Sequence, residues 1–190
     1  MPRRSRVGVA VLGLLLVTGF ARGALAQLVV SFRSPHTARV PSATLSSELA
    51  KRVDETLGQA PPTSPNELLT FALRATGAEL HFGLGHRTSL RFDGREREGN
   101  CIEYAELFAT LYNRAAARST VTARAYSVHS GDARVFGQTL PVRGFGDHDW
   151  VLIVSRKGSE STQLFVDPTL YDAGLGWDIS RSVEGKVTPP

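Results

Sequence analysis

The stretch Gly99-Asn-Cys-Ile-Glu-Tyr-Ala-Glu-Leu-Phe-Ala-Thr-Leu-Tyr-Asn-Arg-Ala115 has the pattern of an amphipathic helix. Asn100 and Glu103 have the spacing of a capping box, with asparagine in place of serine or threonine, so the helix is expected to begin here. Its apolar side chains recur at helical spacing, which predicts a helix that packs on a core and ends near Arg118. The apolar face consists of Cys101, Tyr104, Ala105, Phe108, Leu111, Tyr112 and Ala115.

Cys101 is the single cysteine of the chain and lies in the first turn of this predicted helix. Free backbone N–H groups and the helix macrodipole stabilise an anion at such a position, where thiol pKa values fall below their ordinary value of about 8.5. The same N–H groups can stabilise an oxyanion formed when the thiolate attacks a carbonyl group. Cys101 is therefore placed like a nucleophile. The alternative is a buried cysteine that acts as a small apolar residue.

The periodicity changes from helix to strand after this segment. Residues 121–129 alternate, residues 148–154 form a strong strand pattern, and residues 163–167 form another, which Pro168 ends. Residues 130–147 form a long connection between the first two strands, and such loops are usually functional or contain a short hairpin.

A base for Cys101 is expected among the five histidines, and strand register selects His148. If Lys157-Gly158 is the two-residue turn between the last two strands, His148 and Asp167 face each other directly on one face of the sheet. In isolation, His148 could be an exposed residue at a strand end, and Asp167 could belong to an Asp-Pro turn. Together with Cys101, they predict a Cys-His-Asp triad. Trp150, on the same face as His148, is interpreted as core packing over the Cys101 helix.

Two further helices are expected before the Cys101 helix, over residues 42–57 and 64–76, the second with Ser64 as its N-cap. Residues 27–42 have no sustained period and are read as an extended lead-in. Residues 78–99 have no clear period either, and the arginines among them are interpreted as a solvated loop. Helices first and strands afterwards indicate an α+β domain, with an antiparallel sheet packed on the Cys101 helix.

The N-terminus has the three parts of a secretory signal peptide. Arg3, Arg4 and Arg6 precede an apolar run of 14 residues over 7–20, and an Ala-Leu-Ala site predicts cleavage after Ala26. The run is shorter than the about 20 residues that cross a bilayer. In an oxidising compartment a lone cysteine has no partner for an intramolecular disulfide, so Cys101 would form an intermolecular bridge or remain a free thiol with another use.

The basic charge of the chain belongs to this N-terminal segment. The formal net charge is +4, but residues 1–26 contain four arginines and no acidic residue, so the remaining chain is formally neutral. A general positive field for nucleic-acid binding therefore has no support. With 190 residues, 42% hydrophobic, we expect one globular domain. Its divisions are a signal peptide over 1–26, a lead-in and helix over 27–63, a domain over 64–172 that contains the predicted triad, and a surface tail over 173–190 with Trp177 as a possible anchor.

The chain resembles the transglutaminase-like superfamily of papain-like cysteine enzymes. The resemblance rests on Gly99-Asn-Cys-Ile-Glu-Tyr-Ala105 at a helix start, His148-Asp-Trp-Val151 at a strand start, and Phe165-Val-Asp-Pro-Thr169 at a strand end. It implies a papain-like core in which Cys101 is the nucleophile, His148 the general base and later acid, and Asp167 the group that orients the imidazole. No glutamine or tryptophan that would supply an oxyanion donor stands just before Cys101, which leaves this role to backbone N–H groups.

The resemblance implies acyl transfer at an amide through a thioester, with water or an amine as the acceptor and with no cofactor. The expected product of the gene is thus an exported cysteine peptidase, amidase or transamidase, periplasmic or secreted, that acts on a peptide or protein of the cell envelope. His81 and His86 lack a third ligand at suitable spacing, so no metal site is expected. The alternative function is a non-catalytic module that binds a peptide or the cell wall in the same cleft.

Overall fold

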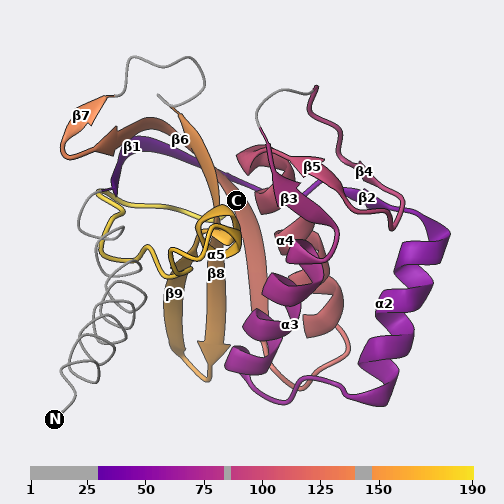
Figure 1. Cartoon of the computed structure of the whole chain (residues 1–190). Coiled ribbons are helices and arrows are strands. Elements are labelled where there is room, and N and C mark those ends of the chain that lie inside the picture. Colours follow the sequence, from indigo (N-terminus) through magenta and orange to yellow (C-terminus); the bar gives the residue numbers. More distant parts are fainter. Residues whose placement is uncertain (1–29, 84–86, 140–146) are drawn as a thin grey trace, which may run out of the picture.

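A computed structural model describes residues 30–83, 87–139 and 147–190, and these residues form a mixed α+β fold. Four helices, α2 to α5, and a curled antiparallel sheet are present in this part of the chain (Figure 1). The predicted signal peptide over 1–26 lies outside the described residues. Within the described residues, no helix is both long and apolar enough to cross a membrane.

The main sheet has the strand order β1-β6-β8-β9, and each neighbouring pair is antiparallel. These strands are β1 (Val30–Arg39), β6 (Ala123–Val135), β8 (His148–Lys157) and β9 (Glu160–Val166). The long connection after the first predicted strand contains a short hairpin, because β6 continues to Val135 and turns into β7 (Gln138–Thr139). The expected strands are thus present, and β6 and β8 are longer than their sequence patterns suggest.

Two of the three long helices begin at their predicted capping residues, and the first begins later than expected. The sequence predicts a helix over 42–57, but α2 (Ser47–Gln59) has Ser46 as its N-cap, because Thr44 and Leu45 belong to a strand. Helix α3 (Pro65–Gly77) has Ser64 as its N-cap, whose side chain accepts a hydrogen bond from the backbone of Glu67. Helix α4 (Cys101–Ala116) has the complete predicted capping box. A short fourth helix, α5 (Pro168–Asp172), follows β9 directly.

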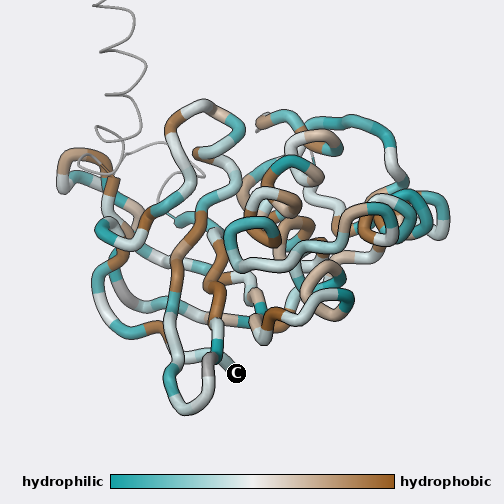
Figure 2. Tube along the Cα trace, turned by 90° about the horizontal axis from the view of Figure 1, so that it is seen from below, coloured by the Kyte–Doolittle hydropathy of each residue, from teal (hydrophilic) through white to brown (hydrophobic). Residues whose placement is uncertain are grey.

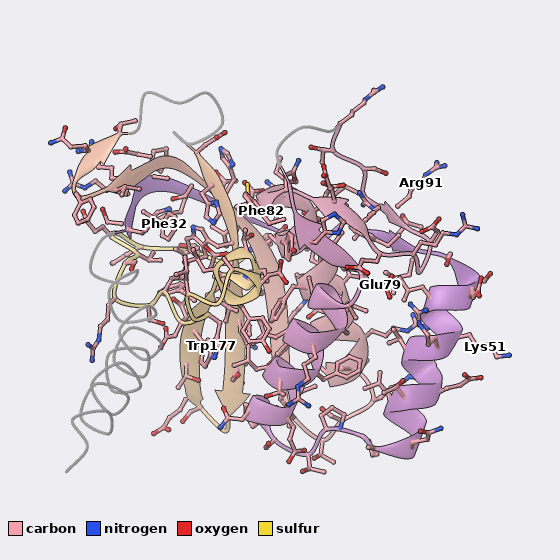
Figure 3. All side chains as sticks on the ribbon, in the orientation of Figure 1. Phe32, Lys51, Glu79, Phe82, Arg91 and Trp177 are labelled. Carbon is pink, nitrogen blue, oxygen red and sulfur yellow. The ribbon has the colours of Figure 1, made fainter. Side chains whose placement is uncertain are left out.

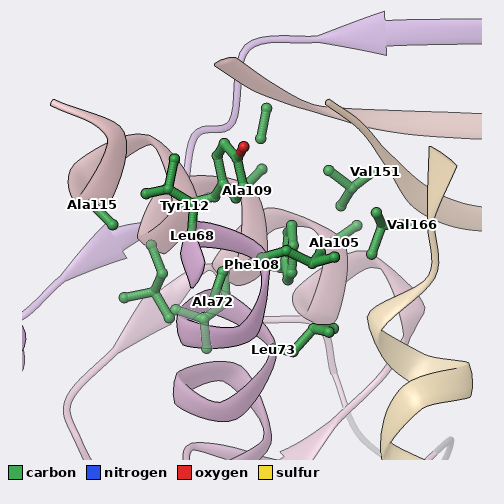
Figure 4. Packing of buried hydrophobic residues seen from close by; sticks show 14 of the residues in the cluster. Leu68, Ala72, Leu73, Ala105, Phe108, Ala109, Tyr112, Ala115, Val151 and Val166 are labelled. Carbon is green, nitrogen blue, oxygen red and sulfur yellow. The ribbon is translucent and has the colours of Figure 1, made fainter. Parts of the chain in front are cut away.

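The main core lies where α3 and α4 pack on one face of the sheet (Figure 4). Phe108 and Leu107 of α4 are completely buried, as are Leu68 and Ala72 of α3, and Val151 and Val166 supply the sheet side of this core. Helix α2 adds Leu49, Val53 and Leu57, and the rest of its surface is largely hydrophilic (Figure 2). The Cys101 helix is therefore clamped between the sheet and the other helices, which fixes the position of its first turn.

A second core covers another part of the sheet and contains segments from both ends of the described chain. Trp150 and Phe32 lie at its centre, together with Ile179 and Val187 from beyond α5. The chain after residue 172 was expected to be a surface tail, but the carbonyl oxygen of Trp177 accepts a hydrogen bond from the Asp167 backbone, and Val183 forms a bridge with Phe32. This segment packs as part of the domain because its sparse apolar residues, although they lack a period, are buried.

Two segments without a clear sequence period contain strands. Residues 27–42 were expected to be an extended lead-in, but most of them form β1, an edge strand of the main sheet. Pro35 lies where the register of β1 with β6 shifts. The region before α4 contains two short parallel pairs, β2 (Thr44–Leu45) with β4 (Arg91–Phe92) and β3 (Leu80–Phe82) with β5 (Arg97–Gly99). These strands have two or three residues, which is too few for an alternating pattern to be recognised.

Candidate active site

Cys101 is the first residue of α4, and the capping box fixes this helix start. The Asn100 side chain accepts a hydrogen bond from the Glu103 backbone, and the Glu103 carboxylate accepts one from the Asn100 backbone. Tyr104 N–H donates to the Asn100 carbonyl oxygen. The cap therefore uses the N–H groups of residues 103 and 104, and those of Cys101 and Ile102 remain as first-turn donors that it does not use.

Glu103 also ties the preceding loop to the start of α4. Its side chain is fully buried and accepts hydrogen bonds from the backbone of Ser89 at 3.0 Å and from the guanidinium of Arg97 at 2.6 Å. Arg97 was expected in a solvated loop, but it forms this ion pair and is only 26% exposed. A buried carboxylate requires such partners, because an unpaired charge in the interior is costly. The loop over 87–99 is thus anchored to the nucleophile helix.

Glycine is required immediately before the cap. A Cβ atom on Gly99 would lie 2.9 Å from a methyl group of Leu80, which is itself buried in the core. The missing side chain lets β3 pair closely with β5, so that Phe82 faces Gly99. The ring of Phe82 is 42% exposed and forms an apolar surface near the start of α4 (Figure 3).

His148 is the first residue of β8, and Asp167 follows the last residue of β9. The predicted turn between these strands is wrong: Gly158 and Ser159 connect them, with Val151 opposite Val166 and Lys157 opposite Glu160. Gly158 has φ of 62°, as at the first central position of a type II′ turn, which shifts the register by two residues from the prediction. His148 and Asp167 are therefore diagonal neighbours and do not face each other directly, and an even shift keeps them on one face.

The diagonal arrangement still brings the two side chains into contact. Nε2 of His148 lies 2.7 Å from Oδ2 of Asp167. The carboxylate of Asp167 is fully buried, and its Oδ1 atom accepts hydrogen bonds from the backbone N–H groups of Thr169 and Leu170 at the start of α5. Asp167 is thus held rigidly as the N-cap of a helix while its second oxygen engages the imidazole.

The electrostatic surroundings favour the protonated form of His148. Burial lowers its pKa, but this effect is outweighed by the charge and hydrogen bond of Asp167 and by hydrogen-bonding and charge interactions with the Cys101 side chain, so the pKa is well above its usual range. Because Nε2 is engaged by Asp167, Nδ1 is the ring nitrogen left for the thiol. The three residues of the predicted triad are thus brought together in the order Cys101, His148, Asp167.

Aromatic side chains hold the His148 ring on its other side. Phe32 of β1 stacks on the imidazole, with ring centroids 5.3 Å apart and planes 13° from parallel. Trp150 is completely buried in the same second core, with its ring 6.3 Å from that of Phe32. The expectation that Trp150 packs over the Cys101 helix is wrong, because even-numbered residues of β8 face the second core while Val151 faces α4.

Tyr104, one turn after the nucleophile, connects α4 to α5. Its hydroxyl group is 2.6 Å from Oδ2 of Asp172 and 3.0 Å from the carbonyl oxygen of Leu80. Burial raises the pKa of Tyr104, and the hydrogen bond to Asp172 and its charge raise it further, so the hydroxyl stays protonated at neutral pH. The helix that Asp167 caps is therefore tied to the helix that Cys101 begins.

Phe32 and Tyr104 were not recognised as site residues from the sequence. Tyr104 was assigned to the apolar helix face. A tyrosine at such a position has a buried hydroxyl group that needs a hydrogen-bond partner, and this was a signal for its role. Phe32 lies in a segment without a period, where no pattern connects it to a residue more than a hundred positions later. Its role depends on the pairing of β1 with β6, which is a long-range contact.

A groove elsewhere in the described structure is a second candidate ligand site, and none of the triad residues lines it. This groove, of about 820 Å³, lies between α2 and α3, and Leu49, Phe71 and Arg74 are among its lining residues. No group of three or more histidine, cysteine, aspartate or glutamate side chains in the described part of the chain is arranged to hold a metal ion. His86, one of the two histidines weighed as metal ligands, lies outside the described residues.

Comparisons with known proteins do not assign this chain to a family. No family model matches the sequence, and neither a curated protein nor a solved structure is found to be similar to it. The arguments about function therefore rest on the site itself.

Proposed function

We propose that this protein is an exported, transglutaminase-like cysteine enzyme that cleaves or transfers an acyl group at an amide bond. The observation that supports it most is the position of the His148 imidazole, which interacts with the Cys101 thiol and lies 2.7 Å from the buried Asp167 carboxylate. A thiol at a helix start, a histidine beside it and a carboxylate behind the histidine is the arrangement of cysteine acyl-transfer enzymes. Its core would be papain-like, as the resemblance implies.

The first chemical step joins the Cys101 sulfur to the substrate carbonyl carbon. The thiolate adds to the carbonyl, and the resulting oxyanion accepts hydrogen bonds from the backbone N–H groups of Cys101 and Ile102, which the helix cap does not use. When the C–N bond breaks, the imidazolium of His148 gives its proton to the leaving amine. A thioester on Cys101 and a neutral His148 remain.

The second step returns the enzyme to its starting state. Water or an amine donates a proton to His148 as it attacks the thioester carbonyl, and the Cys101 thiolate leaves. With water the product is a carboxylic acid, and with an amine it is a new amide. Asp167 keeps the imidazole in place in both steps, because its carboxylate is fixed by the α5 cap. The charge of this carboxylate favours the protonated form of His148.

The proposed substrate is a peptide or protein of the cell envelope. This part of the proposal follows from the predicted signal peptide, which would export the chain, and from the acyl chemistry of the triad. A peptide-library digest and an amine-incorporation assay, both under reducing conditions, test it. Cleavage indicates a hydrolase and amine incorporation a transamidase, and in either case Cys101→Ala is expected to abolish activity. Activity that survives in Cys101→Ala, or silence in both assays, would contradict the proposal, and silence would leave the non-catalytic binding module.

A further inference from the structure

A charge network with two buried carboxylates and a partly exposed arginine lies between the Cys101 helix and the His148 strand. Glu106 of α4 and Asp149 of β8 have exposed fractions of 1% and 2%, and Arg39 at the end of β1 bridges them. Nε of Arg39 is 3.1 Å from Oε1 of Glu106, and its Nη2 is 2.5 Å from Oδ2 of Asp149. None of these three residues belongs to the triad.

Each carboxylate oxygen of the pair has a hydrogen-bond partner. Oε1 of Glu106 also accepts from the Ser127 hydroxyl at 2.6 Å, and its Oε2 accepts from the backbone of Ser42 at 2.5 Å. Oδ1 of Asp149 is 2.7 Å from Nδ1 of His129, which lies on the neighbouring strand β6. The network therefore connects strands β1, β6 and β8 and the segment before α2 to one helix.

Arg39 and Glu106 keep their charges in this network. Burial raises the pKa of Glu106, but the hydrogen bonds from Ser127, Ser42 and Arg39 outweigh it, so the pKa lies below its usual range. Burial lowers the pKa of Arg39, and its attraction to Asp149 and its hydrogen bonds to both carboxylates outweigh that effect. Arg39 and Glu106 thus stay charged at neutral pH.

The place of the two acids in the chain relates this network to the triad. Glu106 is in the same helix as Cys101, little more than one turn later, and Asp149 directly follows His148. We propose that Arg39 is a positioning residue that sets the separation of the Cys101 thiol and the His148 imidazole by fixing α4 to the start of β8. This inference rests on the proposed function, since it assumes that the two groups act as a pair.

Stability is a weak reason for the presence of this network. Apolar side chains of similar volume often stabilise a fold as well as, or better than, a buried ion pair does. The planar guanidinium makes directed hydrogen bonds to two carboxylates at once, which lysine cannot reproduce with the same geometry. Directed bonds between two elements fix their separation more closely than apolar packing, and a nucleophile and its base require that.

The test measures the alkylation rate of Cys101 with iodoacetamide from about pH 5 to pH 9. This small neutral probe needs no binding site, so its rate reports on the thiol. Wild type, His148→Ala, Arg39→Lys, Arg39→Ala and Asp149→Asn are compared under conditions where circular dichroism shows each to be folded. Asp54→Asn is the matched control, because Asp54 pairs with Arg114 and fixes the same helix to α2, away from His148.

We expect Arg39→Ala and Asp149→Asn to lower the rate near pH 6 by about tenfold, toward that of His148→Ala, with Arg39→Lys between them and wild type. Asp54→Asn is expected to keep the wild-type alkylation rate within about twofold. This should hold even if its urea unfolding midpoint falls as far as the midpoints of the Arg39 and Asp149 variants do. Wild-type rates in the Arg39 and Asp149 variants would overturn the positioning role, as would an equal loss in Asp54→Asn. A wild-type rate that does not depend on His148 would overturn the proposed function itself.

Discussion

Asp167 serves His148 and α5 with different oxygen atoms of one carboxylate. Oδ2 lies 2.7 Å from Nε2 of His148, and Oδ1 accepts the hydrogen bonds of Thr169 and Leu170. An asparagine at this position can keep the cap, because its oxygen accepts the same two bonds, but it lacks the charge. The two roles of Asp167 can therefore be separated by mutation.

We predict that Asp167→Asn lowers activity by at least about a hundredfold while the protein remains folded. The loss follows because the neutral amide no longer favours the imidazolium form of His148. The assay is peptide cleavage or amine incorporation, whichever the wild type shows, with circular dichroism as the check on folding. Asp167→Ala, the comparison variant, is expected to lose stability as well, since it removes the α5 cap. Full activity in Asp167→Asn would show that the charge has no part in catalysis.

The Asp167 charge should also make stability depend on pH through His148. Because the pKa of His148 is raised in the folded state, its contribution is complete below the unfolded value of about 6.5 and is lost as pH rises through the folded value. Asp167→Asn should thus reduce the free energy of unfolding by about 1.5–3 kcal/mol near pH 5.5 and by less near pH 9. Urea unfolding at both pH values measures the difference. If the stability difference between Asp167→Asn and wild type were larger near pH 9 than near pH 5.5, the prediction would be contradicted.

Glu103 is expected to be the most sensitive residue of the helix start. Glu103→Ala removes the buried partner of Arg97 and half of the capping box, and we predict a loss of about 3 kcal/mol in the free energy of unfolding. Glu103→Gln retains an acceptor for the Asn100 backbone and should lose less, because glutamine also serves in capping boxes. Chemical denaturation of both variants measures this order, and equal losses would mean that the cap contributes nothing beyond the ion pair.

Tyr104→Phe is predicted to have a small effect. The substitution removes one hydroxyl group between α4 and α5, and the exposed Asp172 can bind water instead, so the expected loss is about 1 kcal/mol. Activity should fall by less than about tenfold, since Asp167 keeps its own cap. Thermal unfolding and the activity assay together measure both quantities. Complete loss of activity without unfolding would place the Tyr104 hydroxyl in the chemistry itself.

Local patterns predicted the elements that position the site. The capping residues Ser64 and Asn100, the apolar face of α4 and the apolar strand pattern of β8 each depend on neighbours in sequence, and each element formed as expected. The pairing of His148 with Asp167 was expected for a partly wrong reason. The turn was misplaced by one residue, and the contact formed because the resulting shift of two preserves the face of the sheet.

Long-range contacts were not accessible from the same patterns. Phe32 stacks on His148 only because β1 pairs with β6, and β1 is interrupted at Pro35 and has no regular alternation. Glu106 lies outside the predicted apolar face of α4, where an exposed charge is expected, yet it is buried, and its partner Arg39 lies 67 residues earlier in the chain. The sequence pattern therefore did not indicate this buried acid, and only the fold determines which residue pairs with it.

The interaction of Cys101 with His148 is the central element of this account, and one measurement tests it most directly. Mass spectrometry of the intact protein gives the iodoacetamide reaction rate of Cys101 as a function of pH in wild type and in His148→Ala. Wild type should react rapidly well below pH 8, and His148→Ala should be slower by at least about tenfold near pH 6. Equally slow reaction of the two proteins below about pH 8 would contradict the assignment of Cys101 as an activated nucleophile.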